Sequence, residues 1–236
     1  MAEWRNWSGS VVAAPTELAG PRTLAELQAV VARAARVRVA GSGHSFMPLC
    51  ETDGVLVSLA DLEGELEIAA DRQSVWTPAG WSIARLTAAL WDEGLSLANQ
   101  GDIDKQAIAG ALATGTHGTG RTLGSLSTLA QAFRLVLADG SVIECDAGRE
   151  GDLFEAQRVS LGMLGVMAAV RLSVMPAYRL RETIRRAPLD EVLGEWEALT
   201  RRHRHVEFFV FPYADQAMLK ILEPVDEGDD PIVKDP

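Results

Sequence analysis

Hydrophobic and polar positions near the start of the chain predict a helix followed by a short strand. From Leu24 to about Ala35, hydrophobic residues recur every three or four positions, the spacing of an amphipathic helix. Thr23 and Glu26 form a capping box, in which the hydroxyl accepts from the Glu26 N–H and the carboxylate returns to Thr23. Residues 36–40 then alternate polar and apolar, which predicts a strand that ends at a glycine-rich loop. The order of helix, strand and glycine-rich loop is typical of the start of an α/β domain.

The middle of the chain shows mainly strand patterns. Two hairpins are predicted, one turning near Asp71 and one at Asp139-Gly140, a dipeptide that strongly favours a tight turn. Short runs rich in hydrophobic residues predict strands at residues 54–59, 66–68, 74–77, 132–137, 142–145 and 166–174.

Two further helices are predicted between these strands. Ser82 can cap a helix with hydrophobic residues at helical spacing, which Gly94 would end in a left-handed conformation. Asp152 and Glu155 resemble a second N-terminal capping pair. Helices and strands that are mixed in this way predict an α+β fold.

The pattern changes after Arg179. Residues 189–199 predict one amphipathic helix, and residues 207–211 and 218–222 predict two strands of a new sheet. One helix and two strands cannot make an independent core, so the second domain looks unfinished. The acidic, proline-bearing residues 226–236 offer nothing to pack. We therefore expect one domain over residues 1–176 and a partial second domain over residues 177–236.

Composition agrees with a folded, water-soluble chain. Of its 236 residues, 47% are hydrophobic and 23% are charged, the balance of a globular protein that can bury a sizeable core. The formal net charge of −11 repels phosphate backbones, so nucleic acid is not an expected partner.

Cysteine usage and the N-terminus predict a cytoplasmic protein without a membrane span. Cys50 and Cys145 are the only cysteines and form no CxxC pair, which favours a reducing compartment and leaves a single disulfide open. Residues 1–10 lack the apolar core of a signal peptide. The longest nearly apolar stretch, residues 161–170, is far shorter than the ~18 residues of a membrane helix.

Two glycine-rich segments carry the strongest chemical signal. In residues 41–46 (GSGHSF), glycines allow consecutive backbone N–H groups to converge on an anion such as a pyrophosphate. Phe46 occupies the third glycine position of a Rossmann fingerprint, so that motif is not matched. In residues 110–120 (GALATGTHGTG), small side chains leave room for a flat ligand and threonine hydroxyls can donate to it. Either segment alone is more simply a tight turn, whereas two in one domain favour a ligand site.

Other chemistries receive little support. His44, His117, His203 and His205 are the candidate metal ligands, but no HExxH or spaced Cys/His cluster accompanies them. His203 and His205 are explained more simply by the end of a helix, whose dipole favours cations. No GxSxG, Walker A or SxxK motif is present, and the two cysteines are expected in the core. No metal site is predicted.

The two glycine-rich segments make the chain resemble the flavoprotein oxidases of the vanillyl-alcohol oxidase (PCMH) type, in particular their sugar lactone and alditol branch. The resemblance runs from about Trp4 to Leu222. Residues 206–213 (VEFFVFPY) resemble the first cap strand of the lactone oxidases, which favours lactones over alditols. The matching motifs are WRNWSG (4–9), GSGHS (41–45), NQGDI (99–103), IAG (108–110), TGTHGTG (114–120) and LGMLGV (161–166).

The resemblance implies a two-subdomain PCMH-type FAD-binding domain followed by the start of an α/β substrate (cap) domain. The family's covalent flavin histidine falls on His44, and its pyrophosphate loop falls on Gly41, Ser42, Gly43 and Ser45. The candidate FAD site as a whole comprises Ala40, Gly41, Ser42, Gly43, His44, Ser45, Phe46, Asp102, Ala107, Gly110, Thr114, Gly115, Thr116, His117, Gly118 and Val166.

The implied activity is oxidation of the CH–OH group of an aldono-1,4-lactone or sugar alcohol. Hydride would pass to flavin N5, with dioxygen or another acceptor reoxidising the flavin. Two departures qualify the match. Ala107 stands where relatives often carry Ser or Thr, and the chain stops at Pro236 without the family's C-terminal His-Trp-Gly motif and substrate-polarising base. The resemblance thus implies a C-terminally truncated chain. No catalytic residue is assigned, and Glu207 and Lys220 are expected to be surface charges.

Three alternatives stay open on sequence grounds. An alditol oxidase is the first alternative, although residues 206–213 favour a lactone oxidase. A nicotinamide-dependent UDP-sugar reductase would share the fold but lacks a flavin-linked histidine, so GSGHS argues against it. A flavin-binding fragment that catalyses no turnover is also consistent with the missing part of the cap domain.

Overall fold

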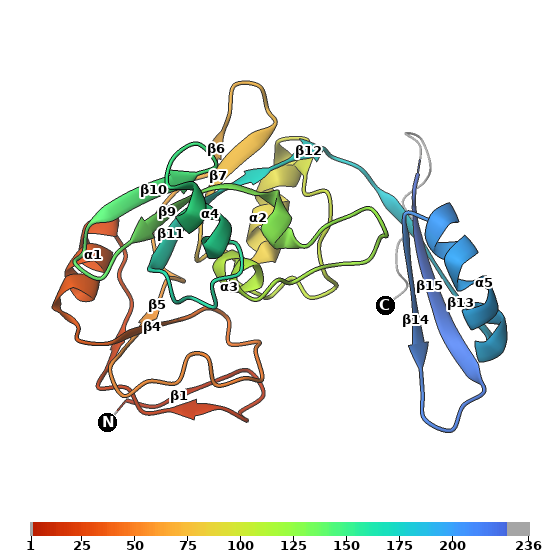
Figure 1. Cartoon of the computed structure of the whole chain (residues 1–236), viewed down its shortest axis with the longest axis horizontal. Coiled ribbons are helices and arrows are strands. Elements are labelled where there is room, and N and C mark those ends of the chain that lie inside the picture. Colours follow the sequence, from red (N-terminus) through yellow and green to blue (C-terminus); the bar gives the residue numbers. More distant parts are fainter. Residues whose placement is uncertain (1, 226–236) are drawn as a thin grey trace.

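A computed structural model describes residues 2–225 and arranges them as a mixed body with a smaller C-terminal sheet beside it (Figure 1). The body contains a parallel sheet of three strands and an antiparallel sheet of five strands. The N-terminal hairpin, β1 (Trp4–Arg5) with β2 (Val12–Ala13), lies beside the smaller sheet. The predicted α+β class is confirmed.

The parallel sheet forms one half of the body. Its order is β3 (Glu17–Ala19), β5 (Val55–Ser58) and β4 (Val37–Ala40), and α1 (Leu24–Arg33) packs on it. Thr23 caps α1 as predicted, accepting from the Glu26 N–H at 3.2 Å. The reciprocal half of the capping box differs, because the Glu26 carboxylate accepts from the Arg22 N–H at 2.8 Å.

The antiparallel sheet forms the other half. Its order is β10 (Val142–Asp146), β9 (Ala130–Val136), β11 (Val166–Ser173), β7 (Ser74–Pro78) and β6 (Glu67–Ile68). Both predicted hairpins are confirmed. Short strands β8 (Leu95–Ser96) and β12 (Met175–Pro176) pair nearby.

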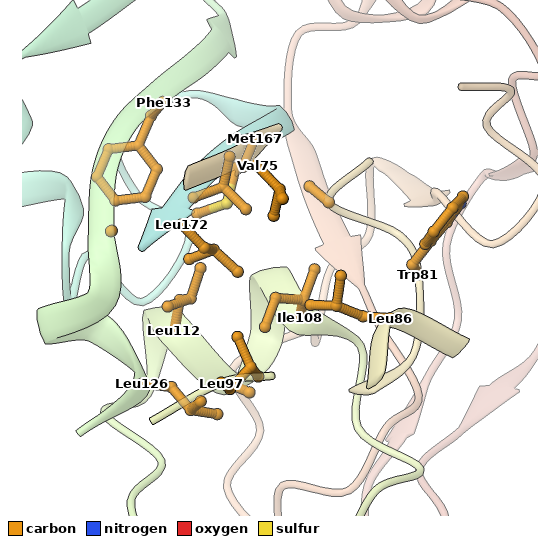
Figure 2. Packing of buried hydrophobic residues seen from close by; sticks show 14 of the residues in the cluster. Val75, Trp81, Leu86, Leu97, Ile108, Leu112, Leu126, Phe133, Met167 and Leu172 are labelled. Atoms are coloured by element: carbon orange, nitrogen blue, oxygen red, sulfur yellow. The ribbon is translucent and has the colours of Figure 1, made fainter. Parts of the chain in front are cut away.

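Helices α2 (Ile83–Asp92), α3 (Ile108–Ala113) and α4 (Gly151–Gln157) cover one face of this sheet, with a 3₁₀ turn at Leu126–Leu129. Figure 2 shows Leu86, Ile108 and Leu112 from the helical side meeting Val75 and Leu172 from the strands. The opposite face contributes small hydrophobic residues to a second cluster around α1. The five-stranded sheet is thus buried under helices on one face. On the other face it is buried at the end beside α1, whereas Trp76, Arg134 and Arg171 farther along stay half-buried.

Local capping predictions were right for α2 and wrong for α4. Ser82 accepts from the Arg85 N–H at 3.1 Å, and Gly94 has a φ of +68° after the helix. Asp152 does not cap α4, because the helix already begins at Gly151 and Glu150 precedes it with a φ of +54° and no side-chain capping bond. Asp152 lies instead in the first turn, where its charge favours the helix dipole.

The C-terminal unit has one strand more than predicted. Strand β13 (Leu180–Pro188) pairs with β15 (Gln216–Pro224), which also pairs with β14 (His205–Val210), and α5 (Leu189–Arg202) covers the face away from the body (Figure 1). The sequence missed β13 because it is an exposed edge strand without hydrophobic alternation. With β13 the unit has its own small core, made by Ala187, Val192, Leu199, Val206, Ala217 and Leu219.

The uncovered face of the C-terminal sheet contacts the body through buried polar groups. Lys220 is 9% exposed, and its Nζ lies 2.9 Å from a carboxylate oxygen of Asp102 and 2.9 Å from one of Glu207. Burial alone would lower the pKa of Lys220, but hydrogen bonds to Glu207 and Asp102 outweigh it and the pKa is raised. The Thr119 hydroxyl lies 3.1 Å from His205 Nδ1. Lys220 therefore joins the C-terminal sheet to the body, and the expectation of a surface charge was wrong.

None of the helices in residues 2–225 has the length and apolar character needed to cross a membrane. Residues 226–236, predicted from sequence as an unpacked tail, lie outside the described residues.

Gly80→Ala is expected to destabilise the body. A Cβ at Gly80 would lie 1.9 Å from the Leu59 carbonyl oxygen, so the ends of β7 and β5 would have to separate. We expect a loss of about 1–3 kcal/mol in the free energy of unfolding, measured by chemical denaturation. Gly194→Ala is the matched control: the position is exposed inside α5 with nothing near an added Cβ, and it should gain about 0.5–1 kcal/mol. Equal effects of the two substitutions would contradict the close approach.

Lys220→Met is expected to weaken the attachment of the C-terminal sheet. The substitution leaves the carboxylates of Asp102 and Glu207 without their shared cation, and we expect a loss of about 1–3 kcal/mol, reduced by the solvent exposure of Asp102. Lys105→Met is the control, because Lys105 is exposed and its ion-pair partner is only the adjacent Asp104. An unfolding curve of Lys220→Met that coincides with the control would rule out this role of Lys220.

Candidate functional site

A cavity of about 310 Å³ opens between the two halves of the body. The carboxyl ends of the parallel strands β4 and β5 meet there, an arrangement that commonly binds ligands in sheets of this kind. Three segments close it: the glycine loop after β4, the region around α3, and the loop between α4 and β11.

The glycine loop of residues 41–45 forms the first wall. The backbone N–H groups of residues 42–45 donate no hydrogen bond to any residue that the structure describes. Gly43 has a φ of +67°, and a Cβ there would press on Trp4 and Asn6 at 3.2–3.3 Å. The loop is held from outside by Trp7 N–H to Gly43 C=O at 2.9 Å and by the Asn6 side chain to Ser45 C=O at 3.0 Å. The wall therefore presents free amides on a fixed backbone.

His44 lines the cavity at its half-exposed rim. Its ring stacks on Trp7 with the centroids 5.3 Å apart and the planes 18° from parallel, and Phe46 meets the same Trp7 edge-on. The stack fixes the imidazole plane while the ring nitrogens make no hydrogen bond to a described residue. His44 thus has free nitrogens beside the cavity.

The second wall is formed by α3 and the residues just before it. Ile108 N–H donates to Trp81 C=O at 2.8 Å and Ala109 N–H donates to Ala79 C=O at 3.0 Å, which fixes the start of the helix. Ala107, its N-cap residue, makes no side-chain capping bond. Nothing lies within 4 Å of a Cβ added at Gly110, so this position leaves open space on the cavity side.

The third wall comes from the end of α4 and the loop that leads into β11. Ser160, Leu161 and Gly162 line the cavity, and Leu161 N–H donates to Ala113 C=O at 3.1 Å. Leu161 and Gly165 both have positive φ values, so the loop turns sharply around the cavity. Gln157 is 1% exposed and lines the same wall.

The structure brings nine of the sixteen residues of the predicted site to the cavity: Ala40, Gly41, Ser42, Gly43, His44, Ser45, Ala107, Gly110 and Thr114. The remaining seven lie outside its lining: Phe46, Asp102, Gly115, Thr116, His117, Gly118 and Val166.

Three of these seven residues are held by other contacts. Thr116 accepts from the Gln106 side chain at 3.3 Å, and Gly118 packs so closely on Gln100 that a Cβ would lie 2.1 Å from its carbonyl oxygen. The Val166 side chain belongs to the core beside α1. The second glycine-rich segment therefore splits: its start lines the cavity, while its end packs against the body and the C-terminal sheet.

The four histidines do not gather. His44 stacks on Trp7, His117 contacts the Gly118 carbonyl, His203 pairs with Glu223 at the end of α5, and His205 contacts Thr119. Burial and the neighbouring Arg204 lower the pKa of His205. Within residues 2–225, no group of three or more His, Cys, Asp and Glu side chains is placed to hold a metal ion.

Sequence reasoning missed several cavity residues, among them Arg38, Cys50, Ser58, Gly80, Gln157 and Ser160. Ser58 could have been found, because it ends a predicted strand parallel to the one before the glycine loop. Cys50 is a free thiol at the cavity and not a core residue as expected, whereas Cys145 is buried as expected. Burial raises the pKa of Cys50, so the thiol is neutral at physiological pH.

The charge of the cavity differs from that of the chain. No Asp or Glu lines it among the described residues, although the chain carries a net charge of −11, and Arg38 contributes a cation. Free amides, small side chains and the absence of carboxylates suit an anionic ligand with a flat apolar part.

Two family profiles match consecutive parts of the chain. The family described as "FAD binding domain" matches residues 15–146, which include the glycine loop and the walls before α4. The family described as "D-arabinono-1,4-lactone oxidase" matches residues 170–235, which include the C-terminal sheet.

Similar curated proteins carry related names. The chain is 40% identical to L-gulono-1,4-lactone dehydrogenase of Mycobacterium tuberculosis over 97% of its own length and 54% of the relative's. It is 31% identical to L-gulonolactone oxidase of Mus musculus over 92% of its length and 50% of the relative's, and 30% identical to D-arabinono-1,4-lactone oxidase of Yarrowia lipolytica, covering 91% and 42%. The chain therefore spans about half the length of these relatives.

The fold has a clear counterpart among solved structures. The cholesterol oxidase of B. sterolicum superposes with a TM-score of 0.82, covering 94% of this chain and 47% of that one at 20% identity. This likeness shows the fold of the chain. With a profile match over more than half of its residues, the chain belongs to the FAD-binding domain family.

Proposed function

We propose that this chain is the FAD-binding part, with the start of the cap, of an oxidoreductase that oxidises the CH–OH group of an aldono-1,4-lactone. The observation that carries the proposal is the order of two matches: the FAD-binding profile covers the glycine loop and α3, which line the cavity, and the D-arabinono-1,4-lactone oxidase profile covers the C-terminal sheet. The named relatives act on L-gulono- and D-arabinono-lactones by their printed names.

The division into domains supports this arrangement. We assign residues 1–176 to the FAD-binding domain and residues 177–236 to a partial cap, because β12 ends at Pro176 in the body and β13 begins the C-terminal sheet at Leu180. The uncovered face of that sheet turns toward the body (Figure 1). A substrate would then lie between this face and the flavin.

FAD fits the residues that line the cavity. The free amides of residues 42–45 suit the two negative charges of a pyrophosphate, and the absence of carboxylates removes the repulsion that such a group would meet elsewhere on this acidic chain. Gly41 and Ala107 approach so closely that a Cβ on Gly41 would lie 3.0 Å from the Ala107 Cβ, so small residues are required where the walls meet. Ser42, Ser45 and Thr114 add hydroxyls to the lining.

FAD when bound would supply the acceptor for a hydride from the substrate carbon. The chain's own task is to orient the cofactor and keep water from it. We propose that His44 forms the covalent bond to the flavin, because its ring plane is fixed by Trp7 and its nitrogens are free at the cavity rim. For the seven predicted residues outside the cavity lining, contact with the flavin stays a prediction.

The electron acceptor and the compartment complete the proposal. We propose dioxygen as acceptor; the dehydrogenase and oxidase names among the relatives make a comparison with an artificial acceptor necessary. We place the protein in the cytoplasm, supported by two free thiols.

The activity is tested with a substrate panel on the purified protein. Under anaerobic conditions, L-gulono-1,4-lactone or D-arabinono-1,4-lactone should bleach the flavin absorbance, and air or an artificial acceptor should restore it. Bleaching by sorbitol or xylitol but by neither lactone would replace the lactone assignment with alditol oxidation. Bound flavin that no substrate bleaches would indicate a flavin-binding fragment without turnover.

His44→Ala is expected to abolish covalent attachment while leaving dissociable FAD. The variant removes the proposed nucleophilic nitrogen but none of the loop amides. After acid precipitation, flavin should remain in the pellet for the wild type and move to the supernatant for His44→Ala. His117→Ala is the control, because His117 is exposed and outside the cavity lining, and it should retain acid-stable flavin. Acid-stable flavin in His44→Ala would refute the assignment.

Gly110→Leu is expected to block FAD binding without unfolding the chain. The added side chain meets no protein atom within 4 Å of its Cβ and would fill the cavity instead. We expect an unchanged circular dichroism spectrum and at least a tenfold weaker affinity for FAD, about 1.4 kcal/mol or more. Gly194→Leu places the same side chain on the exposed face of α5 and should bind FAD normally. Normal binding by Gly110→Leu would place the cofactor elsewhere.

A further inference from the structure

Gln157 is a buried polar side chain without a partner. The residue is 1% exposed, and its carboxamide oxygen, Oε1, has no hydrogen-bond partner among the described residues. Its carboxamide nitrogen donates no hydrogen bond to a described residue either. A buried polar group left in this state costs about 1–3 kcal/mol relative to a satisfied one, so such groups are rare and usually have a reason.

The backbone beneath Gln157 is firmly held. Phe154, one turn earlier in α4, is 2% exposed and packs on Phe133 with the ring centroids 5.7 Å apart. The next residue, Arg158, lies over the Phe154 ring and donates to Ser127 C=O at 2.8 Å. Both neighbours are therefore held by the core, which fixes the backbone from which the Gln157 side chain projects.

The cavity is the remaining direction for this carboxamide. Gln157 belongs to the cavity lining, as do Ser160, Gly162 and Ala113. The hydroxyl of Ser160 already accepts from the Gly162 N–H at 3.3 Å, and Gln106 on the opposite wall donates to Thr116 at 3.3 Å. Gln157 is therefore distinguished from the other polar residues of these walls by having its hydrogen-bonding capacity unused.

We propose that Gln157 is a cofactor-binding residue, whose carboxamide hydrogen-bonds the donor–acceptor edge of one of the two heterocycles of FAD. The inference rests on the proposed FAD site. A carboxamide presents one acceptor and one donor side by side and exchanges them by a half-turn of its terminal torsion. Adenine offers a matching pair in its amino group and adjacent ring nitrogen, and the pyrimidine edge of the flavin offers one in its N–H and carbonyl. Bound FAD would supply the hydrogen-bond partners that the Gln157 carboxamide lacks within the protein.

This role predicts opposite effects on the free and the bound protein. Gln157→Met keeps the length of the side chain and removes its polar end, so the apoprotein should lose an unsatisfied group and be as stable as the wild type or more stable. The same change removes two hydrogen bonds to FAD, which should weaken its affinity about 10- to 100-fold. A purely structural residue would lower both quantities together.

The experiment uses apoprotein from a riboflavin-starved host. The wild type, Gln157→Met and the control Gln131→Met are titrated with FAD, and the dissociation constant is read from flavin fluorescence in the first seconds after mixing. Gln131 is exposed in β9 and outside the cavity, so its substitution should change nothing. The thermal midpoint of each apoprotein is measured in parallel.

The possible results distinguish the role of Gln157 from the proposed FAD site on which it rests. Weaker FAD binding by Gln157→Met with an undiminished thermal midpoint supports the inference. Unchanged affinity, or affinity and stability that fall together, overturns it while leaving the FAD site intact. Failure of the wild type to bind FAD overturns both. Parallel titrations with ADP and with FMN show which heterocycle Gln157 contacts, because the loss should appear with the half that carries it.

Discussion

The close approach of two backbone walls is the constraint on which the site depends. Gly41 meets Ala107, and Gly80 meets the carbonyl of Leu59, at distances that leave no room for another side chain. These contacts join the carboxyl end of the parallel sheet to the start of α3 and to the end of β7. The second hydrophobic cluster packs the parallel sheet and α1 against one end of the five-stranded sheet, and small residues set how closely the two walls approach.

Charged side chains are distributed so that carboxylates lie away from the cavity. An acidic chain keeps every described Asp and Glu out of the cavity lining and uses carboxylates elsewhere, most clearly where Asp102 and Glu207 share Lys220. That cluster joins the C-terminal sheet to the loop before α3, so the proposed cap is tied to the proposed FAD-binding domain by ionic contacts and by hydrogen bonds such as that between Thr119 and His205. The same arrangement explains why a buried lysine keeps its charge.

Much of the fold and part of the site could be predicted from the sequence. Local signals were sufficient for the Ser82 cap, the Gly94 terminus and the hairpin at Asp139-Gly140, because each depends on residues only a few positions apart. The glycine loop was found for the same reason. Strand β13 was missed because its neighbours in the sheet, and not its own pattern, make it a strand.

The features that could not be predicted from the sequence depend on contacts between residues far apart in the chain. Gln157 gave no sequence signal, since its importance lies in lacking partners inside a core that local pattern does not reveal. Lys220 was taken for a surface charge because Asp102, its partner, lies 118 positions away. The later part of the second glycine-rich segment was assigned to the ligand as one unit, whereas Gly118 is small because Gln100 packs against it.

The most direct test of an FAD site in the cavity is the flavin content of the purified chain. It is measured from the visible absorbance after incubation with FAD and removal of the excess. We expect one FAD per chain, held between the two halves of the body. A chain that is folded by circular dichroism yet retains no flavin, and shows no binding when FAD is added back, would contradict it.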